Sequence, residues 1–595
     1  MYLESLKLEN FRKYKNLKVN FTKGLNLLVG ENDSGKTAIV DAIKYVLGTQ
    51  SYDFIRPQYE DFHLDNNGVR STKFRITCIF RDLKPQEAAH FLDWIGMDDN
   101  GEYYLKVWLE ANRNDNRVFY EIRAGIDDEG TQLSSMAKDY LRSVYLKPLR
   151  DAENELSPKK GSRLSQILSS RDEFIDKENH TLKKIFEEAN IKIKEYFKEK
   201  EGKIISDDIN KYLSDFSLNT NRLNSEFQVS ESSLKSILEK LSLKIGESIP
   251  GLGSHNILYI AVEMLLLKKD YTGLKLVLVE EIEAHIHPQL QMKLIKEIQK
   301  IAKDYEIQFI LTSHSPNLAS KVELENLILC KNNDVFPMGS KYTQLLEGDY
   351  KFLERFLDVT KANLFFANGV MLVEGNSENI LIPTLASLIG RDLTDYGVSI
   401  VNVGGVAFLR YSRIFLRNDD KNIDIPVAVV TDVDVKPDED GNYKNKSEKK
   451  IEKKRKKYSK DNVKAFITPY WTLEYTLALS GLSEIFYQAV YICDKTRNDD
   501  YKYDESDIKE YIKQANEIYK KWKEEKTNKE IAYEIYKKTI ISKRISKVAV
   551  AQVFAKLLID NSESVKDIIL KDEYLIYLID AIKYVTSGSN DSNNR

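Results

Sequence analysis

Two stretches of the chain alternate short, continuous apolar runs with longer segments of helical periodicity. The apolar runs read as strands buried on both faces, because a half-buried strand would alternate apolar and polar positions. Such strands joined by helices predict a parallel sheet covered by helices, so we expect two α/β units. The runs are at residues 25–30, 274–281 and 307–315 in the first stretch and at 369–375, 397–405 and 425–434 in the second.

The pattern changes between and after these stretches. Residues 70–125 contain apolar runs separated by turns and read as strands. Residues 169–245 are charged, poor in glycine and helically periodic, which predicts a helical insertion. From about residue 501 the chain reads as helices rich in Lys, Glu and Tyr, and the tail at 586–595 is expected to be disordered.

Composition narrows the class of protein. Of 595 residues, 42% are apolar and 30% are charged, which is typical of a globular protein. Lys and Arg number 89 against 92 Asp and Glu, so any nucleic-acid surface has to be local. The three cysteines are far apart and form no disulfide framework, which favours a reducing, cytoplasmic setting. The apolar runs are far shorter than the roughly 20 residues of a membrane span, and the N-terminal stretch lacks the apolar segment of a signal peptide.

The segment GENDSGKT, which begins at Gly30, matches the phosphate-binding pattern GxxxxGK[ST] between a strand and a helix. We assign Gly30, Asn32 and Gly35 to nucleotide binding, because backbone N–H groups of such a loop surround the phosphates. Lys36 can reach the β- and γ-phosphates, and the Thr37 hydroxyl can ligate Mg²⁺. The sequence therefore predicts a nucleotide-hydrolysing site; the alternative is a glycine-rich turn with a surface lysine.

Two later apolar runs end in further candidate residues for ATP hydrolysis. Glu280 and Glu281 end the run at 274–281, where Glu280 could lie near Mg²⁺ and Glu281 near the attacking water. His314 closes the run at 307–315 and could contact the γ-phosphate. Taken alone, the glutamates could equally be solvated side chains, and the histidine a packed or surface residue.

Two loops between these motifs contain histidines. Gly251–Asn256 precedes a helix and, with Ser254 at its centre, could present backbone N–H groups to a phosphate across a dimer interface. Two glycines are common in any loop, so this assignment is weak on its own. His285 and His287 suggest zinc, but residues i and i+2 point to different sides of a helix and no third ligand is evident. The zinc interpretation is therefore set aside.

Four carboxylates follow two strands of the second stretch. Glu374 and Glu378 flank a glycine turn, while Asp432 and Asp434 share one face of a strand end. Such a cluster is costly unless a cation neutralises it, and oxygen ligands suit Mg²⁺ or Mn²⁺. Two ions could stabilise the attacking and leaving oxygens of a phosphodiester displacement. The alternative is a pair of acidic loops on a solvated sheet edge.

A basic segment follows the second of these strands. Ten of the 17 residues from Lys444 to Lys460 are Lys or Arg. We expect a basic loop that holds a phosphate backbone without reading bases; the alternative is a solvated, charged loop. The side chains assigned to nucleic-acid contact are Lys449, Lys450, Lys453, Lys454, Arg455, Lys456 and Lys457.

The motifs resemble those of known families. The phosphate loop, the strand with two glutamates and the start Leu6–Arg12 resemble ABC-type ATPases of the SMC and repair class. Glu374 and the DxD pair Asp432–Asp434 resemble the Toprim domain of primases, topoisomerases and certain nucleases. An ABC-type ATPase followed by a Toprim domain is similar to the OLD-family nucleases, and the segments 280–289 and 145–153 also look like that family.

The OLD resemblance implies an α/β fold: an ABC-type ATPase head with a helical insertion, followed by a Toprim (Rossmann-like) domain with a helical C-terminal part. It implies two further site residues, Glu474 as a metal ligand and Lys547 as a lysine that stabilises charge on the scissile phosphate. Glu374, Lys547, Glu281 and His314 are then the expected catalytic residues. The expected domains are ATPase parts at 1–168 and 246–345, a dimerising insertion at 169–245, a linker at 346–368, a Toprim nuclease domain at 369–585 and the tail at 586–595.

The same resemblance implies an ATP-binding and ATP-hydrolysing, metal-dependent DNA endonuclease, in which the ATP state of dimerised heads controls the Toprim site. Its cofactors would be ATP and Mg²⁺ or Mn²⁺, with two ions at the Toprim site. Its partners would be DNA, further copies of the chain and a protein encoded nearby in a bacterial antiphage defence system, without a membrane. Three alternatives stay open: an RNA-cleaving Toprim nuclease, a non-nucleolytic SMC-like DNA-repair ATPase, and an assembly that is silent without its partner.

Overall fold

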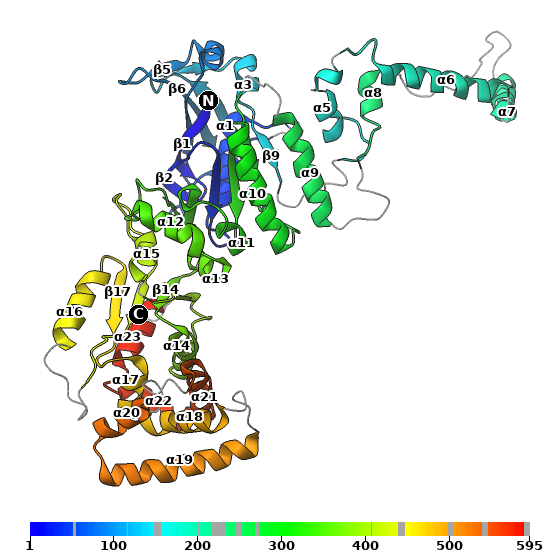
Figure 1. The fold of residues 1–595 in the computed structure, drawn as a ribbon. Coiled ribbons are helices and arrows are strands. Elements are labelled where there is room, and N and C mark those ends of the chain that lie inside the picture. Colours follow the sequence, from blue (N-terminus) through cyan, green and yellow to red (C-terminus); the bar gives the residue numbers. More distant parts are fainter. Residues whose placement is uncertain are drawn as a thin grey trace. The chain divides into compact units, whose positions relative to one another are not determined.

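The structure is a computed structural model in which the described residues form two compact units (Figure 1). The first unit contains residues 1–26 and 37–313, and the second contains 27–36 and 314–595. The described residues are 1–50, 55–115, 117–147, 156–169, 171–174, 176–199, 202–216, 233–243, 252–267, 273–405, 407–437, 447–497, 504–537 and 545–587. Gly251, residues 148–153 of the predicted segment 145–153, residues 444–446 and the tail from 588 lie outside them.

An antiparallel sheet dominates the first unit. Its strands follow the order β2-β1-β4-β6-β7-β8, and β5 pairs with β6. The strands are β1 (Tyr2–Phe11), β2 (Tyr14–Asn20), β4 (Lys73–Arg81), β5 (Ile95–Met97), β6 (Tyr103–Asn114), β7 (Arg117–Ala124) and β8 (Thr131–Gln132). In β4 the side chains of Phe74, Ile76, Cys78 and Phe80 are fully buried, because every second residue of a strand faces the same side. The strands predicted within 70–125 are thus confirmed.

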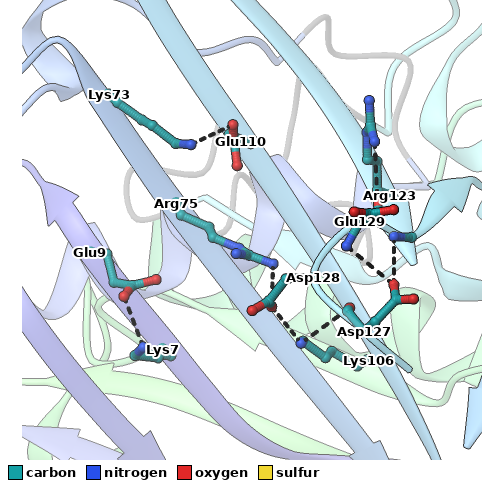
Figure 2. Close-up of polar contacts among 11 residues, drawn as sticks. Lys7, Glu9, Lys73, Arg75, Lys106, Glu110, Arg123, Asp127, Asp128 and Glu129 are labelled. Carbon is teal, nitrogen blue, oxygen red and sulfur yellow. Dashed lines mark hydrogen bonds and ion pairs between the residues drawn. The ribbon is translucent and has the colours of Figure 1, made fainter. Parts of the chain in front are cut away.

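The other face of this sheet carries paired charges (Figure 2). Lys73 on β4 and Glu110 on β6 lie 2.6 Å apart, and Lys106 lies 2.9 Å from Asp128. Arg75 also contacts Asp128, at 3.1 Å. The cations labelled there are thus paired with acidic side chains.

The first unit also holds three parallel strands, β9 (Val144–Leu146), β10 (Leu276–Val279) and β11 (Gln308–Ser313), with β10 in the middle. All residues of β10 and β11 are buried, as their continuous apolar runs predict. Its helices include α1 (Lys36–Leu47), α9 (Leu252–Leu267) and α10 (Pro288–Asp304). Helix α10 begins where His287 accepts a hydrogen bond from the Gln289 amide, so His287 is an N-cap.

Four helices occupy or adjoin the predicted insertion: α5 (Arg163–Ser169), α6 (Thr181–Glu199), α7 (Gly202–Phe216) and α8 (Leu234–Leu238). Helix α6 packs on α7, and α5 packs on α8 and α9. A buried, two-bond ion pair joins Arg163 on α5 to Glu263 on α9, with N···O distances of 2.6 and 2.8 Å. No residue of α6 is fully buried, and its apolar side chains are half-buried or exposed.

The second unit contains a group of three paired strands and a larger, separate sheet. In the group of three, β12 (Leu327–Lys331) pairs in parallel with β3 (Leu25–Val29) and antiparallel with β13 (Asp334–Pro337). The larger sheet is parallel, with the order β15-β14-β16-β17. Its strands are β14 (Gly369–Val373), β15 (Val398–Asn402), β16 (Val427–Thr431) and β17 (Val463–Ile467). In this order the chain changes direction between β14 and β16, and such switch points create a crevice at the carboxyl ends of the strands.

Helices surround the larger sheet (Figure 1). Its core joins Met371, Val373 and Val430 to apolar side chains from the helices that follow. The helices are α12 (Glu347–Phe356), α13 (Val359–Ala362), α14 (Asn376–Leu388), α15 (Phe408–Ser412), α16 (Ser447–Tyr458), α17 (Leu473–Leu479), α18 (Ser483–Thr496), α19 (Glu505–Glu525), α20 (Asn528–Tyr536), α21 (Lys547–Asp560), α22 (Ser562–Lys571) and α23 (Ile576–Val585). The predicted helical C-terminal part is therefore confirmed.

Two segments differ from their predictions. The basic segment was expected to be a loop, but residues 447–458 form the helix α16. The expectation was wrong because Lys, Arg, Glu and Ile all favour helix, and Glu452 pairs with Lys456 one turn later. The segment 346–368, predicted as a linker, contains α12 and α13 and buries Leu353 and Leu364. Throughout the described ranges, no helix has the length and apolar character needed to cross a membrane.

Candidate functional site

The predicted phosphate loop has the backbone shape that its glycines allow. Gly30 has φ +154° and Gly35 has φ +98°, and a Cβ at Gly30 would lie 2.3 Å from the Cys330 carbonyl oxygen. Lys36 is 7% exposed, and its Nζ donates to the carbonyls of Gly30 and Glu31 at 2.8 and 2.7 Å. The ammonium group thus lies inside the loop, where it would meet the phosphates of a nucleotide. Asn32 is exposed on the same loop.

Glu280 and Thr37, the two predicted Mg²⁺ ligands of this site, are hydrogen-bonded to each other. Glu280 ends β10 and is 3% exposed. Burial raises the pKa of its carboxyl group, and hydrogen bonds from Tyr145 and Thr37 oppose that rise. The Tyr145 hydroxyl donates to Glu280 Oε1 at 2.7 Å. The arrangement brings a hydroxyl and a carboxylate together, which is a donor set that suits Mg²⁺.

Tyr145 is a site residue that the sequence did not single out. It lies on β9, which pairs with β10 so that Tyr145 is opposite Leu278. The ammonium group of Lys44 lies 3.7 Å from the centroid of its ring. The only sequence signal was its membership of the family-like segment 145–153.

Of the remaining predicted residues of the ATP site, Glu281 and His314 lie on loops, whereas Ser254, which was expected in a loop before a helix, lies within helix α9. Glu281 has φ +43°, and its amide donates to Thr312 Oγ1 at 3.0 Å, which fixes its backbone beside β11. His314 directly follows β11 and is exposed. Ser254 is exposed on the first turn of α9. A Cβ at Gly253 would lie 2.5 Å from the His285 carbonyl oxygen, so this turn packs tightly against the loop that follows β10.

The carboxylates of the second unit gather at one edge of the parallel sheet. Glu374 follows β14 and accepts a hydrogen bond from Thr431 Oγ1 on β16 at 3.2 Å. Asp432 follows β16 and accepts a hydrogen bond from the Leu473 amide at 2.9 Å. That contact places the start of α17, and with it Glu474, next to the strand ends. We name the group Glu374, Glu378, Asp432, Asp434 and Glu474 the carboxylate cluster.

Two members of the carboxylate cluster are costly to ionise. Burial raises the pKa of Glu378 to about 7, and the charges of Glu474 and Glu374 add to the rise. Burial also raises the pKa of Asp432 well above its usual value, again with help from the other four carboxylates. Groups that are costly to ionise so close together fit a divalent cation, which favours their charged forms.

Two lysines form ion pairs with members of the carboxylate cluster. Lys547 Nζ lies 3.1 Å from Glu474 Oε1, and Lys454 Nζ lies 2.7 Å from Asp434 Oδ2. Among the residues that the structure describes, no three His, Cys, Asp or Glu side chains stand in a finished metal-binding arrangement. The cluster therefore brings the ligand types together, and these lysine contacts hold two of its members.

Helix α16 presents two faces. Lys450 and Lys454, one turn apart, point to the carboxylate cluster, and Lys450 Nζ donates to the Asp434 carbonyl at 2.8 Å. The side chains on its exposed face, which we name the basic face, are Lys449, Lys453, Arg455, Lys456 and Lys457. The seven predicted nucleic-acid residues thus divide into two that contact the cluster and five that face solvent.

The phosphate loop and the carboxylate cluster together define a class of protein. Members of this class use a nucleotide at one site of the chain and a divalent cation at another. Over residues 1–319 the chain belongs to the family described as AAA ATPase domain, and residues 365–434 match the Overcoming lysogenization defect protein-like TOPRIM domain. The first match contains the phosphate loop and Glu280, and the second contains every member of the carboxylate cluster except Glu474. The expected ATPase and Toprim domains are thereby confirmed.

Three curated relatives match more than half of this chain, and the matched part covers at least three quarters of each relative. Endonuclease GajA from Bacillus cereus (strain HuB5-5) is 22% identical over 74% of this chain and 78% of its own. The OLD nuclease from Thermus scotoductus is 24% identical over 76% and 87%, respectively. Septu protein PtuA from Bacillus thuringiensis is 25% identical over 55% of this chain and 75% of its own. The expected similarity to OLD nucleases is confirmed.

Proposed function

We propose that the protein is an ATP-regulated, divalent-metal-dependent endonuclease that cuts DNA at its TOPRIM site. The observation that carries the proposal is the carboxylate cluster, in which acids that follow β14 and β16 meet the buried Glu378 of α14 and Glu474 of α17 at one sheet edge. The relatives named Endonuclease GajA and OLD nuclease support the same activity. Placing these acids close together costs free energy, and a non-nucleolytic role gives no reason for that cost.

The chain's residues have distinct roles in the proposed reaction. The carboxylate cluster would hold two Mg²⁺ or Mn²⁺ ions, which supply charge stabilisation for the attacking and leaving oxygens. Glu374 accepts the proton of the attacking water in addition to being a ligand. Lys547, which reaches the cluster at Glu474, neutralises charge on the scissile phosphate. The basic face of α16 holds the phosphate backbone of the substrate.

ATP binds at the phosphate loop in this proposal. Lys36 contacts the β- and γ-phosphates, while Thr37 and Glu280 hold the Mg²⁺ of the nucleotide. Glu281 orients the attacking water, and His314 contacts the γ-phosphate. Ser254 contributes to the site of a second copy, so the functional unit is a dimer or a larger homo-oligomer. Gly30, Asn32 and Gly35 surround the phosphates through their backbone.

Cleavage of supercoiled plasmid by the full chain tests the proposal. We expect nicking or linearisation with Mg²⁺ or Mn²⁺, and a change of rate when ATP is added. Glu374→Ala should abolish the cut, whereas Glu563→Ala, an exposed glutamate on α22, should leave it intact. Cleavage of total RNA but not of plasmid would replace DNA by RNA as the substrate, and cleavage by Glu374→Ala would place the chemistry elsewhere.

We further propose a cytoplasmic role in antiphage defence together with a partner encoded nearby. The support is the resemblance to OLD-family proteins and the similarity to the Septu protein PtuA. Expression of the chain with its genomic neighbours should lower the plaque count of at least one phage. The same operon carrying Glu374→Ala should give full plaque counts; equal protection by both would refute the nuclease as the defence activity.

A further inference from the structure

A second opening lies on the other side of β14 from the carboxylate cluster. Strand β14 pairs with β16 on one side and with β15 on the other. Next to the end of β15 is a cavity of about 880 Å³, lined by residues from α12, α13, α14, β15 and α15. We name it the side cavity. Its size is within the usual range for small-molecule and nucleotide sites.

One wall of the side cavity is aromatic. The rings of Phe352 and Phe356 stack with a centroid distance of 4.4 Å, and the Phe356 side chain is 52% exposed. The guanidinium carbon of Arg410 lies 4.1 Å from the centroid of the Phe352 ring. An exposed ring beside a guanidinium group is a surface on which a flat, electron-rich ring such as a nucleobase stacks.

The facing wall carries carboxamides. Asn376 and Asn379 are exposed on the first turns of α14, and Asn402 ends β15. Asn402 Nδ2 donates to Asn376 Oδ1 at 2.8 Å, and Asn402 Oδ1 accepts from the Gly404 amide at 2.9 Å, so two of the amides are held in position. Carboxamides offer a donor and an acceptor side by side, which is the pattern needed to pair with the edge of a base.

The side cavity shares its backbone with the carboxylate cluster. Asn376 lies between Glu374 and Glu378 in the sequence, and the Gly405 amide donates to the Glu374 carbonyl at 3.1 Å. A Cβ at Gly404 would meet no atom within 4 Å, so the glycine turn leaves its side of the cavity open. A ligand in the side cavity would therefore contact the same turn that carries Glu374 and Glu378.

We propose that the side cavity holds one unstacked nucleotide of the DNA strand, adjacent to the phosphodiester that is cut. The base stacks on Phe356, the carboxamides contact its edge, and Arg410 or Lys361 contacts a neighbouring phosphate. This inference rests on the proposed nuclease function and adds to it a substrate preference: sites at which one base leaves the duplex at low cost, such as mismatches or unpaired positions.

A thermodynamic cycle between the base and the cavity tests the inference. The substrates are duplex oligonucleotides that contain the mapped cut site, with an abasic residue placed in turn at each flanking position. The enzymes are the wild type, Phe356→Ala, Asn379→Ala and the control Leu346→Ala, which removes an apolar side chain of similar exposure (59%) outside the cavity. At one position, base removal should raise KM about tenfold in the wild type and the control, but leave KM unchanged in Phe356→Ala.

Each result decides the matter. Coupling of one position to both Phe356 and Asn379 supports the inference. Cleavage with equal KM at every abasic position overturns it while leaving the proposed nuclease intact, and absence of any DNA cleavage overturns both. The last measurement is the binding of deoxynucleoside 5′-monophosphates. If they bind the wild type but not Phe356→Ala, and no abasic position is coupled to Phe356, the cavity takes free nucleotides and the inference is overturned.

Discussion

At the scale of single residues, Glu378 is the member of the carboxylate cluster whose raised pKa has a defined value. Its carboxyl group is 7% exposed and faces Glu474 and Glu374, so its pKa rises from 4.5 to about 7. Between pH 4.5 and about pH 7, the folded protein therefore keeps the proton on Glu378, whereas the unfolded chain has already released it. Folding stability must fall as the pH rises through this window, by on the order of 3 kcal/mol.

We expect the melting temperature of the metal-free protein, measured in EDTA, to fall between pH 4.5 and pH 7 more steeply for the wild type than for Glu378→Gln. Glutamine cannot ionise, so the mutant lacks this contribution to the slope. Mn²⁺ should raise the wild-type melting temperature more at pH 8 than at pH 5, because the ion competes with protons. The exposed-site variant Glu563→Gln should follow the wild type, and equal slopes for Glu378→Gln would contradict the raised pKa.

Tyr145 gives the second test at this scale. Its hydroxyl donates to the buried Glu280 carboxylate, and a hydrogen bond to a charged group contributes about 1.5–3 kcal/mol. Tyr145→Phe should raise the pKa of Glu280 further and weaken binding of Mg²⁺·ATP about tenfold or more, measured by calorimetry. Tyr120→Phe, at a 42% exposed position, is the control; unchanged affinity in Tyr145→Phe would separate Glu280 from the magnesium site.

Residue types and spacing revealed most of the candidate site but not this tyrosine. Glycines, a lysine and strand-end acids have chemistry that local sequence context exposes. Tyr145 becomes a site residue only because β9 pairs with β10, whose residues come about 130 positions later in the chain. No local pattern encodes a pairing of that sequence separation. Glu474 needed the family resemblance for the same reason, since α17 is positioned by the bond from Leu473 to Asp432.

At the scale of elements, α16 shows how charge can hide secondary structure. The density of lysine predicted a basic loop, yet the same residues have high helix propensity and a favourable i,i+4 pair. The buried strands were predictable because both of their faces are covered, which leaves continuous apolar runs. The helix matters for function because it separates Lys450 and Lys454, which face the carboxylate cluster, from the basic face.

Replacement of the five basic-face residues by glutamine should weaken DNA binding and flatten its salt dependence. Each phosphate contact contributes about 0.9 to the slope of log K against log salt, so loss of all five would lower the slope by up to about 4.5. The matched control replaces five exposed lysines of α19: Lys509, Lys513, Lys520, Lys521 and Lys523. If the slope of log K against log salt falls by the same amount in both quintuple variants, the change in net charge causes the effect, and α16 has no special role in it.

At the scale of the whole molecule, the question is whether ATP state controls the cut. Lys36→Ala removes the ammonium group from the phosphate loop and should abolish ATP hydrolysis, measured by phosphate release. The carboxylate cluster contains no residue of that loop, so plasmid cleavage should persist in this variant but no longer respond to ATP. A variant that still hydrolyses ATP would refute the phosphate-loop assignment, and a retained ATP response of cleavage would place the control elsewhere.

The pairing of β3 with β12 has a consequence for how the gene can be divided. The strand that leads into the phosphate loop, at residues 27–29, is hydrogen-bonded along Leu327–Leu329, three hundred residues downstream. A premature stop codon or a fragment ending near residue 319 would leave that side of β3 without its partner, and unpaired strand edges promote aggregation. Expression of an N-terminal fragment should therefore yield insoluble protein unless it extends through β13. A free-standing nucleotide-binding piece therefore has to include β12 and β13, which lie beyond residue 319, where the match to the AAA ATPase domain ends.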